Sequence, residues 1–262
     1  MLNRKLLTIS AAAIWATTAI ITHHYHQSSQ ANPQVPHLRR VSVLDRNASF
    51  LIIGDSLIEG GVGTELEKRL LSNNVRYVKR QGKSSTGLLH PERLDWYAEL
   101  DKIFRERTYD VVIIMFGLND LADITDSNGK HTLGSPSWQV AYAQKVDQIM
   151  QKVLRQGRAK RVIWLGAPIA PDNYKYAHIN NTNIQMINNL YRSVLPRYPN
   201  TIFIDTYYIY TIDGKWTPVI VDQNGEVQQV RTQDGIHITY AGGKIMTDIV
   251  IQVMRANYIS LN

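Results

Sequence analysis

Short apolar runs alternate with longer amphipathic stretches along most of this sequence, and that alternation limits the folds open to it. The run at residues 111–116 is apolar on both faces, which is typical of a strand buried in the middle of a parallel sheet. Parallel neighbours need crossover connections, and the amphipathic stretches supply them. The sequence therefore predicts a three-layer α/β/α fold around a doubly wound, five-stranded parallel sheet. The predicted strands are residues 49–53, 75–78, 111–116, 161–165 and 201–205, and the predicted helices are 59–71, 92–107, 138–155, 179–195 and 240–258.

A β-hairpin is predicted before the last helix. Residues 216–221 and 226–231 flank the dipeptide Asn224-Gly225, which strongly favours a tight hairpin turn. We expect this hairpin to be an insertion into the α/β domain.

The N-terminus has the pattern of a membrane-targeting segment. Arg4 and Lys5 precede an uncharged, apolar stretch at residues 6–22, which is typical of a secretory signal or a signal anchor. Ala31 ends a candidate cleavage site, but polar residues separate that site from the apolar stretch, which favours an uncleaved anchor. We expect a signal anchor or signal peptide over residues 1–22, a polar tether over 23–44 and a globular domain over 45–262. The domain is then periplasmic or otherwise extracytoplasmic, tethered to the inner membrane.

Charge and cysteine content exclude several classes of function. The net charge is +7, but residues 1–40 hold four basic residues and no acidic one, so the remainder carries only +3. That balance, without a basic stripe interleaved with aromatic residues, argues against a nucleic-acid partner. The absence of cysteine excludes a thiolate nucleophile and a cysteine-based zinc site. We expect neither a metal nor another cofactor.

Three polar motifs lie where functional groups gather in such a fold. Gly54-Asp55-Ser56 follows the first strand, Gly117-Leu118-Asn119-Asp120 follows the third, and Asp234-Gly235-Ile236-His237 precedes the last helix. Each motif alone also suits a turn or a helix N-cap. Together they bring a hydroxyl, an amide donor and a carboxylate-oriented imidazole to the carboxyl edge of the sheet, which indicates nucleophilic catalysis.

The chain at these motifs resembles the SGNH (GDSL-type) hydrolase superfamily, whose fold has a flavodoxin-like five-stranded sheet. Residues 84–88 and 231–239, with Pro91 and Asp95-Trp96, are more narrowly similar to a bacterial periplasmic subfamily. The resemblance implies that residues 45–262 form an SGNH hydrolase-like domain.

The resemblance also implies a role for each motif residue. Ser56 is the expected nucleophile, His237 its base and Asp234 the residue that orients His237. Asn119 and the amide of Ser56 are two expected oxyanion donors. A third donor in this superfamily is a glycine amide after the second strand. Gly82 is the candidate here, with the amide of Ser84 as the alternative.

The substrate is less constrained by the sequence. Trp138, Tyr174 and Tyr176 follow the third and fourth strands, and Trp216 lies in the predicted hairpin. Aromatic faces at these places suit either sugar rings or the core. Export favours an acylated envelope polysaccharide or peptidoglycan as the substrate. We therefore expect a serine esterase that removes or transfers O-acyl groups, above all O-acetyl groups. The alternatives are a lipid or aryl-ester hydrolase and, in another class, a non-catalytic glycan-binding or assembly module.

Overall fold

A five-stranded parallel sheet forms the centre of the protein, seen here in a computed structural model that describes residues 47–222 and 224–257. Its strands are ordered β2-β1-β3-β6-β7. This order is flavodoxin-like and confirms the predicted fold class. The strands are β1 (Ser49–Gly54), β2 (Tyr77–Gly82), β3 (Val111–Met115), β6 (Arg161–Leu165) and β7 (Thr201–Ile204).

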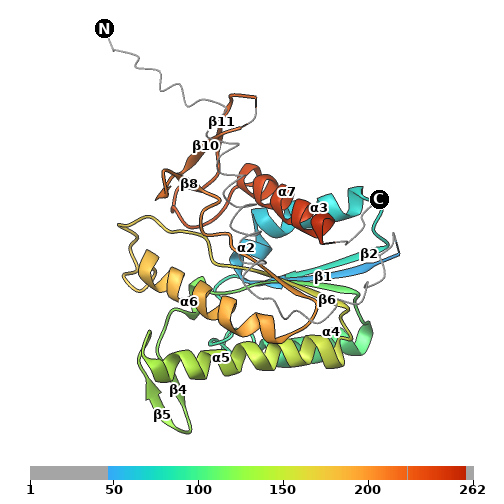
Figure 1. The fold of residues 1–262 in the computed structure, drawn as a ribbon, viewed down its shortest axis with the longest axis vertical. Helices are drawn as coiled ribbons and strands as arrows, with labels where there is room; N and C mark the ends of the chain where they lie inside the picture. The colour runs from blue at the N-terminus through green and yellow to red at the C-terminus, as the bar shows by residue number, and fades with distance from the viewer. Residues whose placement is uncertain (1–46, 223, 258–262) are drawn as a thin grey trace, which may run out of the picture. The chain divides into compact units, whose positions relative to one another are not determined.

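Helices cover both faces of this sheet (Figure 1). The short helix α2 (Ser56–Glu59), α3 (Gly61–Ser72) and the C-terminal α7 (Tyr240–Ala256) lie on one face. On the other face lie α4 (Trp96–Glu106), α5 (Pro136–Gln151) and α6 (Asn181–Val194). The central strands β1 and β3 are buried along their whole length because helices pack against both of their faces.

Of the predicted elements, the second strand and the first helix show the differences that bear on the site. The predicted strand at 75–78 begins later, as β2, because it pairs in register with β1 from Ser49↔Tyr77 to Gly54↔Gly82. It is an edge strand and carries Lys79 and Arg80, so it lacks a continuous apolar run. The predicted helix at 59–71 is divided at Gly60 into α2 and α3. The helical structure begins at Ser56, three residues before the predicted start, because α2 forms a separate first turn.

Small two-stranded hairpins lie in the loops that connect the sheet strands and helices. β4 (Ile124–Asp126) pairs with β5 (Gly129–His131), and β8 (Thr211–Ile212) pairs with β9 (Lys215–Trp216); neither was predicted. The predicted hairpin is present as β10 (Val219–Val221) and β11 (Val227–Gln229). Residues 221–228 at its tip belong to a separate compact unit, where Gly225 adopts φ +82°.

The predicted membrane segment and tether, residues 1–44, lie outside the described residues. Among the helices that the structure describes, none is both long and apolar enough to cross a membrane.

Candidate active site

Ser56 lies at the carboxyl end of β1, at the start of α2. The Oδ1 atom of Asp55 accepts a hydrogen bond from the Leu57 amide at 2.9 Å and so caps this turn. Gly54 permits the close approach of β3 at this point, since a Cβ there would lie 2.4 Å from the carbonyl oxygen of Met115. Ser56 is left half-buried at the sheet edge.

Asp234 and His237 are in direct contact, as predicted from their spacing. The Asp234 Oδ2 atom accepts a hydrogen bond from His237 Nδ1. Its Oδ1 atom accepts from the amides of Ile236 at 2.9 Å and His237 at 3.0 Å and from the Thr232 hydroxyl at 2.7 Å. Burial raises the pKa of Asp234, but hydrogen bonds from His237, Thr232 and Ile236 outweigh it and hold the pKa well below its usual range. Because Nδ1 donates to this carboxylate, Nε2 of His237 is available as the proton acceptor.

Arg231 fastens the loop that carries this pair. Its buried guanidinium donates to the carbonyl oxygens of Ile236 and Ile169, both at 2.6 Å, and lies 4.7 Å from the ring centre of Tyr210. It thereby joins the segment before His237 to the loop after β6. Burial lowers the pKa of Arg231 to about 10, so the guanidinium is still charged near neutral pH. Arg231 belongs to the 231–239 segment that carries the resemblance to the subfamily, but the order of residues in that segment does not reveal this role.

The helices α3 and α7 bring the Ser56 turn close to the His237 loop. A Cβ at Gly61 would lie 2.6 Å from the carbonyl oxygens of Ile238 and Thr239, and one at Gly243 would lie 2.3 Å from the Gly61 oxygen. Backbones approach this closely only where glycine leaves room.

His237 is near enough to Asp55 for its charge to act on that carboxyl. Burial raises the pKa of Asp55 to about 7, and the charge of His237 opposes that rise. Among the described residues, no hydrogen bond joins the Ser56 hydroxyl to the His237 ring. In enzymes without substrate such a bond is often long and forms only in the complex.

Asn119 points its side chain toward the loop after β2. It lies on the turn η1 (Leu118–Asp120), and its Nδ2 donates to the Thr86 carbonyl oxygen at 2.9 Å. Its own carbonyl oxygen accepts from His90 Nε2 at 2.8 Å. One N–H of the amide group therefore remains for an oxyanion.

The two candidates for the third oxyanion donor differ in their surroundings. The Ser84 amide donates to the Glu59 carboxylate at 2.8 Å, so it is already engaged. Gly82 packs against α2, since a Cβ there would lie 2.2 Å from the Glu59 nitrogen. Thr86 lies beside Asn119, and Gly87 lies against Asp120. Both belong to the 84–88 segment that carries the resemblance to the subfamily, but neither was predicted to have a role.

The three predicted substrate-binding aromatics have different environments. Trp138 is fully buried, donates through Nε1 to the Ala122 carbonyl oxygen at 2.7 Å and stacks on Tyr142. It is a core residue, so that prediction is wrong. Tyr174 and Tyr176 meet edge to face at 5.6 Å, and Tyr176, which is 49% exposed, stacks on His178 at 5.8 Å.

The half-buried Tyr174 borders the Asp234 loop. Burial, and secondarily the charge of Asp234, raises the pKa of Tyr174. Trp216 donates to the Gly235 carbonyl oxygen at 3.2 Å from the neighbouring side. Two aromatic residues therefore flank the Asp234–His237 loop, and both are among the aromatics that the sequence places near the site.

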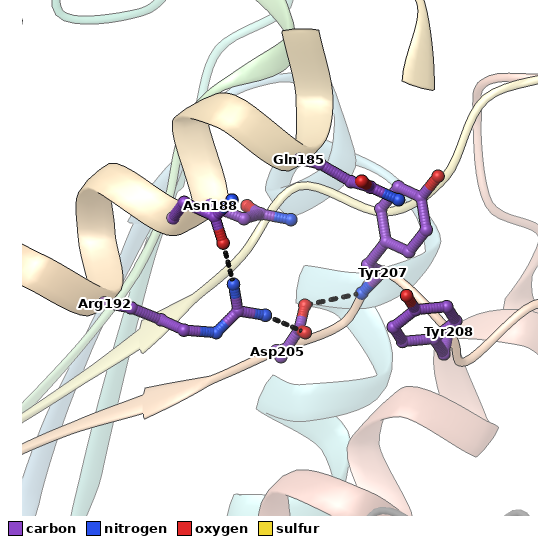
Figure 2. A pocket seen from close by; sticks show the side chains of 7 residues that line it. Gln185, Asn188, Arg192, Asp205, Tyr207 and Tyr208 are labelled. Atoms are coloured by element: carbon purple, nitrogen blue, oxygen red, sulfur yellow. Dashed lines mark hydrogen bonds and ion pairs between the residues drawn. The ribbon is translucent and has the colours of Figure 1, made fainter. Parts of the chain in front are cut away.

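A separate small pocket of about 100 Å³ lies between α6 and the end of β7 (Figure 2). Arg192 and Asp205 form an ion pair across it. The side-chain amide of the fully buried Asn188 accepts a hydrogen bond from the Ala167 amide and donates one to the Ala167 carbonyl oxygen. None of the predicted site residues lines this pocket.

The described residues also hold no cluster of three or more His, Asp or Glu side chains suited to a metal ion.

The order of the sheet strands and the flanking helices give the chain an SGNH-hydrolase-like fold. The chain belongs to the family described as "Protein of unknown function (DUF459)", whose model matches residues 49–253. No curated protein matches this chain significantly in sequence.

Two solved structures illustrate the shared fold. One is a catalytic mutant of an acetylxylan esterase from Geobacillus stearothermophilus, with a TM-score of 0.54 and 15% identity, covering 85% of this chain and 99% of the other. The other, described as a possible lipase from Chitinophaga pinensis, has a TM-score of 0.53 and 14% identity, covering 82% of this chain and all of the other. At this identity the similarity concerns the fold.

Proposed function

We propose that this protein is a serine esterase with Ser56 as nucleophile, His237 as base and Asp234 as the group that orients His237. The observation that carries the proposal is the Asp234–His237 pair, in which every hydrogen bond to the carboxylate leaves Nε2 of His237 free to accept a proton. An imidazole held in one tautomer beside a serine-bearing turn is the arrangement that serine activation requires.

The proposed reaction begins when Nε2 of His237 takes the proton of the Ser56 hydroxyl. The Ser56 oxygen attacks the ester carbonyl carbon. Hydrogen bonds from Asn119 and from backbone amides stabilise the negative charge that forms on the carbonyl oxygen. The bond to the alcohol oxygen then breaks, and that oxygen receives the proton from His237. Water, or the hydroxyl of an acceptor, attacks the acyl-enzyme in the same way and releases Ser56.

For the substrate, we propose O-acetyl groups on a cell-envelope glycan. Tyr174 and Trp216 flank the Asp234–His237 loop, and aromatic side chains beside a site are of the kind that packs on sugar rings. The predicted N-terminal membrane segment would keep the domain next to such a polymer. The acetylxylan esterase with this fold acts on an acetylated polysaccharide, which supports the same class of substrate.

Labelling with a fluorophosphonate tests the nucleophile. We expect the full-length protein to bind one equivalent of probe at Ser56, and Ser56→Ala to abolish both labelling and the hydrolysis of short acetyl esters. The matched control is Ser85→Ala, on the neighbouring loop, which should still label. An inert wild-type protein would favour a non-catalytic glycan-binding module, and label on Ser84 or Ser85 would show a different nucleophile.

A further inference from the structure

Asp120, the residue after Asn119, is a fully buried carboxyl group that the proposed reaction does not use. Its Oδ1 atom accepts a hydrogen bond from the Leu89 amide at 3.0 Å. Gly87 makes room for this contact, since a Cβ there would lie 2.1 Å from Oδ1. One oxygen of Asp120 therefore fixes the loop that also receives the Asn119 side chain through Thr86.

The second oxygen of Asp120 begins a chain of three short contacts. Oδ2 lies 2.7 Å from the Tyr142 hydroxyl, that hydroxyl lies 2.9 Å from the Tyr191 hydroxyl, and the latter lies 3.2 Å from the Phe116 carbonyl oxygen. All four groups are buried away from bulk solvent, where polar groups are almost always hydrogen-bonded.

The hydrogens available to this chain can be counted. A carbonyl oxygen only accepts, so the hydrogen between Tyr191 and Phe116 belongs to Tyr191. If all three contacts are hydrogen bonds, the hydrogen between the two tyrosines then comes from Tyr142, because each hydroxyl has one. No hydrogen is left on Tyr142 for Oδ2, so the third contact is a hydrogen bond only if Asp120 supplies the hydrogen itself.

We propose that Asp120 is a neutral carboxylic acid, whose hydroxyl donates to Tyr142 and whose carbonyl oxygen positions the 86–89 loop beside Asn119. Each of the three contacts is then a hydrogen bond with one donor and one acceptor. Asp120 acts as a positioning residue, through the loop and through Asn119, rather than by touching substrate.

The charged and titratable groups around Asp120 act on its pKa in both directions, and burial is the largest influence. They come from each element packed against it, and they are Asp55, His90, Tyr97, Tyr142 and Tyr191. Burial raises the pKa of Asp120 despite its hydrogen bonds and the opposing charge of His90. The nearby Asp55 is also buried, and a second negative charge there would add repulsion.

The neutral form matters for catalysis, in a way that rests on the proposed function. The oxyanion would form beside Asn119, one residue from Asp120. A carboxylate at Asp120 would repel that oxyanion in a buried setting where charges are weakly screened. A neutral acid makes the same hydrogen bonds to the 86–89 loop and to Tyr142 without placing a negative charge beside the oxyanion.

Infrared spectroscopy on the full-length protein tests the assignment without any substrate. We expect wild-type protein near neutral pH to show carbonyl absorption of protonated carboxylic acids, to which Asp55 also contributes because its pKa is about 7, and Asp120→Asn to remove the component that belongs to Asp120. Asp55→Asn is the matched control, since it changes a second buried carboxyl and should leave the Asp120 band in place. A spectrum that is the same in Asp120→Asn and wild type would overturn the proposal.

Unfolding measured against pH gives a second test. A folded-state pKa above the unfolded value contributes stability at low pH that is lost as the pH rises above the unfolded value, about 3.9. The amide of Asp120→Asn can make the same hydrogen bonds without titrating, so its melting temperature should gain on the wild type as pH rises from about 4 to 8. Parallel melting profiles for the two proteins would contradict a neutral Asp120.

Tyr142→Phe is a second variant that tests the protonation state of Asp120, for use if Asp120→Asn fails to fold. This variant removes the acceptor of the Asp120 hydroxyl, so we expect the carboxylic-acid band to remain and to shift to higher frequency. Absence of the band in both Tyr142→Phe and the wild type would refute the neutral acid.

Turnover of an acetyl ester tests the positioning role. Asp120→Asn should retain at least tenfold more turnover than Asp120→Ala, with the difference in kcat rather than in KM. Equal loss in both variants would show that the site needs a carboxylate and would also overturn the proposal. If the wild type hydrolyses no ester, the proposed function fails, whereas the infrared and melting results still decide the state of Asp120.

Discussion

The carboxylate of Asp234 shows how single contacts determine what a residue can do. Three donors converge on Oδ1 and the His237 ring donates to Oδ2, so the carboxylate has a partner on each oxygen. The stabilised negative charge favours a protonated Nδ1 on His237 and a positive ring once Nε2 accepts a proton. By contrast, Asp120 lies in a buried chain whose contacts need a hydrogen from the acid. Two aspartates in one small site thus have opposite protonation preferences.

At this scale, we predict that Asn119→Ala lowers turnover of an acetyl ester by about 10²–10³-fold, roughly 2.7–4 kcal/mol. The amide donor is most valuable where negative charge develops, so KM should change less than kcat. Steady-state kinetics on the folded variant provide the measurement. His237→Ala is the comparison, with an expected loss of about 10⁴-fold or more. Turnover near the wild-type value in folded His237→Ala would contradict the assignment of the base.

Among the elements, those whose burial dictates their composition were predictable from the sequence. β1, β3 and β6 are central strands covered by helices on both faces, so their sequences are continuous apolar runs. The edge strand β2 has one strand neighbour and ion-paired Lys79 and Arg80, and its polar composition concealed its bounds. Local patterns identify elements by what they bury, and an edge strand buries less.

The candidate site was predictable only where its residues lie close together in the sequence. Asp234 and His237 are three residues apart, and their contact follows from local geometry. The pairing of Asn119 with Thr86 joins segments 33 residues apart, so it depends on the folded sheet. Trp138 looked suited to substrate because it follows the third strand, yet helix α5 turns it into the core.

Arg231 provides a prediction about how two loops are joined. Arg231→Lys keeps the charge but cannot reach both the Ile169 and Ile236 carbonyl oxygens with the same fork of donors. A buried carbonyl oxygen left without a partner costs about 1–3 kcal/mol, so we expect that loss in unfolding free energy and a fall in turnover. The measurement is chemical denaturation alongside steady-state kinetics.

Arg192→Lys is the matched control for that experiment. Arg192 also pairs across a loop, with Asp205, but its side chain is 44% exposed. Exposed pairs contribute at most about 1 kcal/mol, and this one lies away from the predicted site residues. Equal effects of the two substitutions would show that Arg231 has no special part in holding the His237 loop.

On the scale of the whole molecule, the strand order explains why the motifs meet. In the order β2-β1-β3-β6-β7 the chain runs outward from β1 to β2 and then returns to the other side of β1 as β3. Ligands of such sheets bind at the carboxyl ends of the two strands where this reversal occurs. Ser56 follows β1 and Asn119 follows β3, so both lie at that point, and the packing of α7 on α3 adds the His237 loop.

The last prediction concerns where this molecule works. Arg4 and Lys5 followed by the apolar residues 6–22 should keep the N-terminus in the cytoplasm and place the folded domain outside the inner membrane. A reporter that is active only after export, fused after Asn262, should therefore be active. Replacing Ile14 and Ile20 by arginine should abolish that activity, since each charge in an apolar segment costs about 2.5–3.5 kcal/mol on insertion scales. The mature N-terminus, read by mass spectrometry, separates the two forms of targeting: a start before residue 6 indicates an anchor, whereas a start at Asn32 indicates a cleaved signal. A fusion that is active only with a cytoplasmic reporter would exclude an envelope glycan as the substrate, while leaving the chemistry of Ser56 and His237 to be judged on its own kinetics.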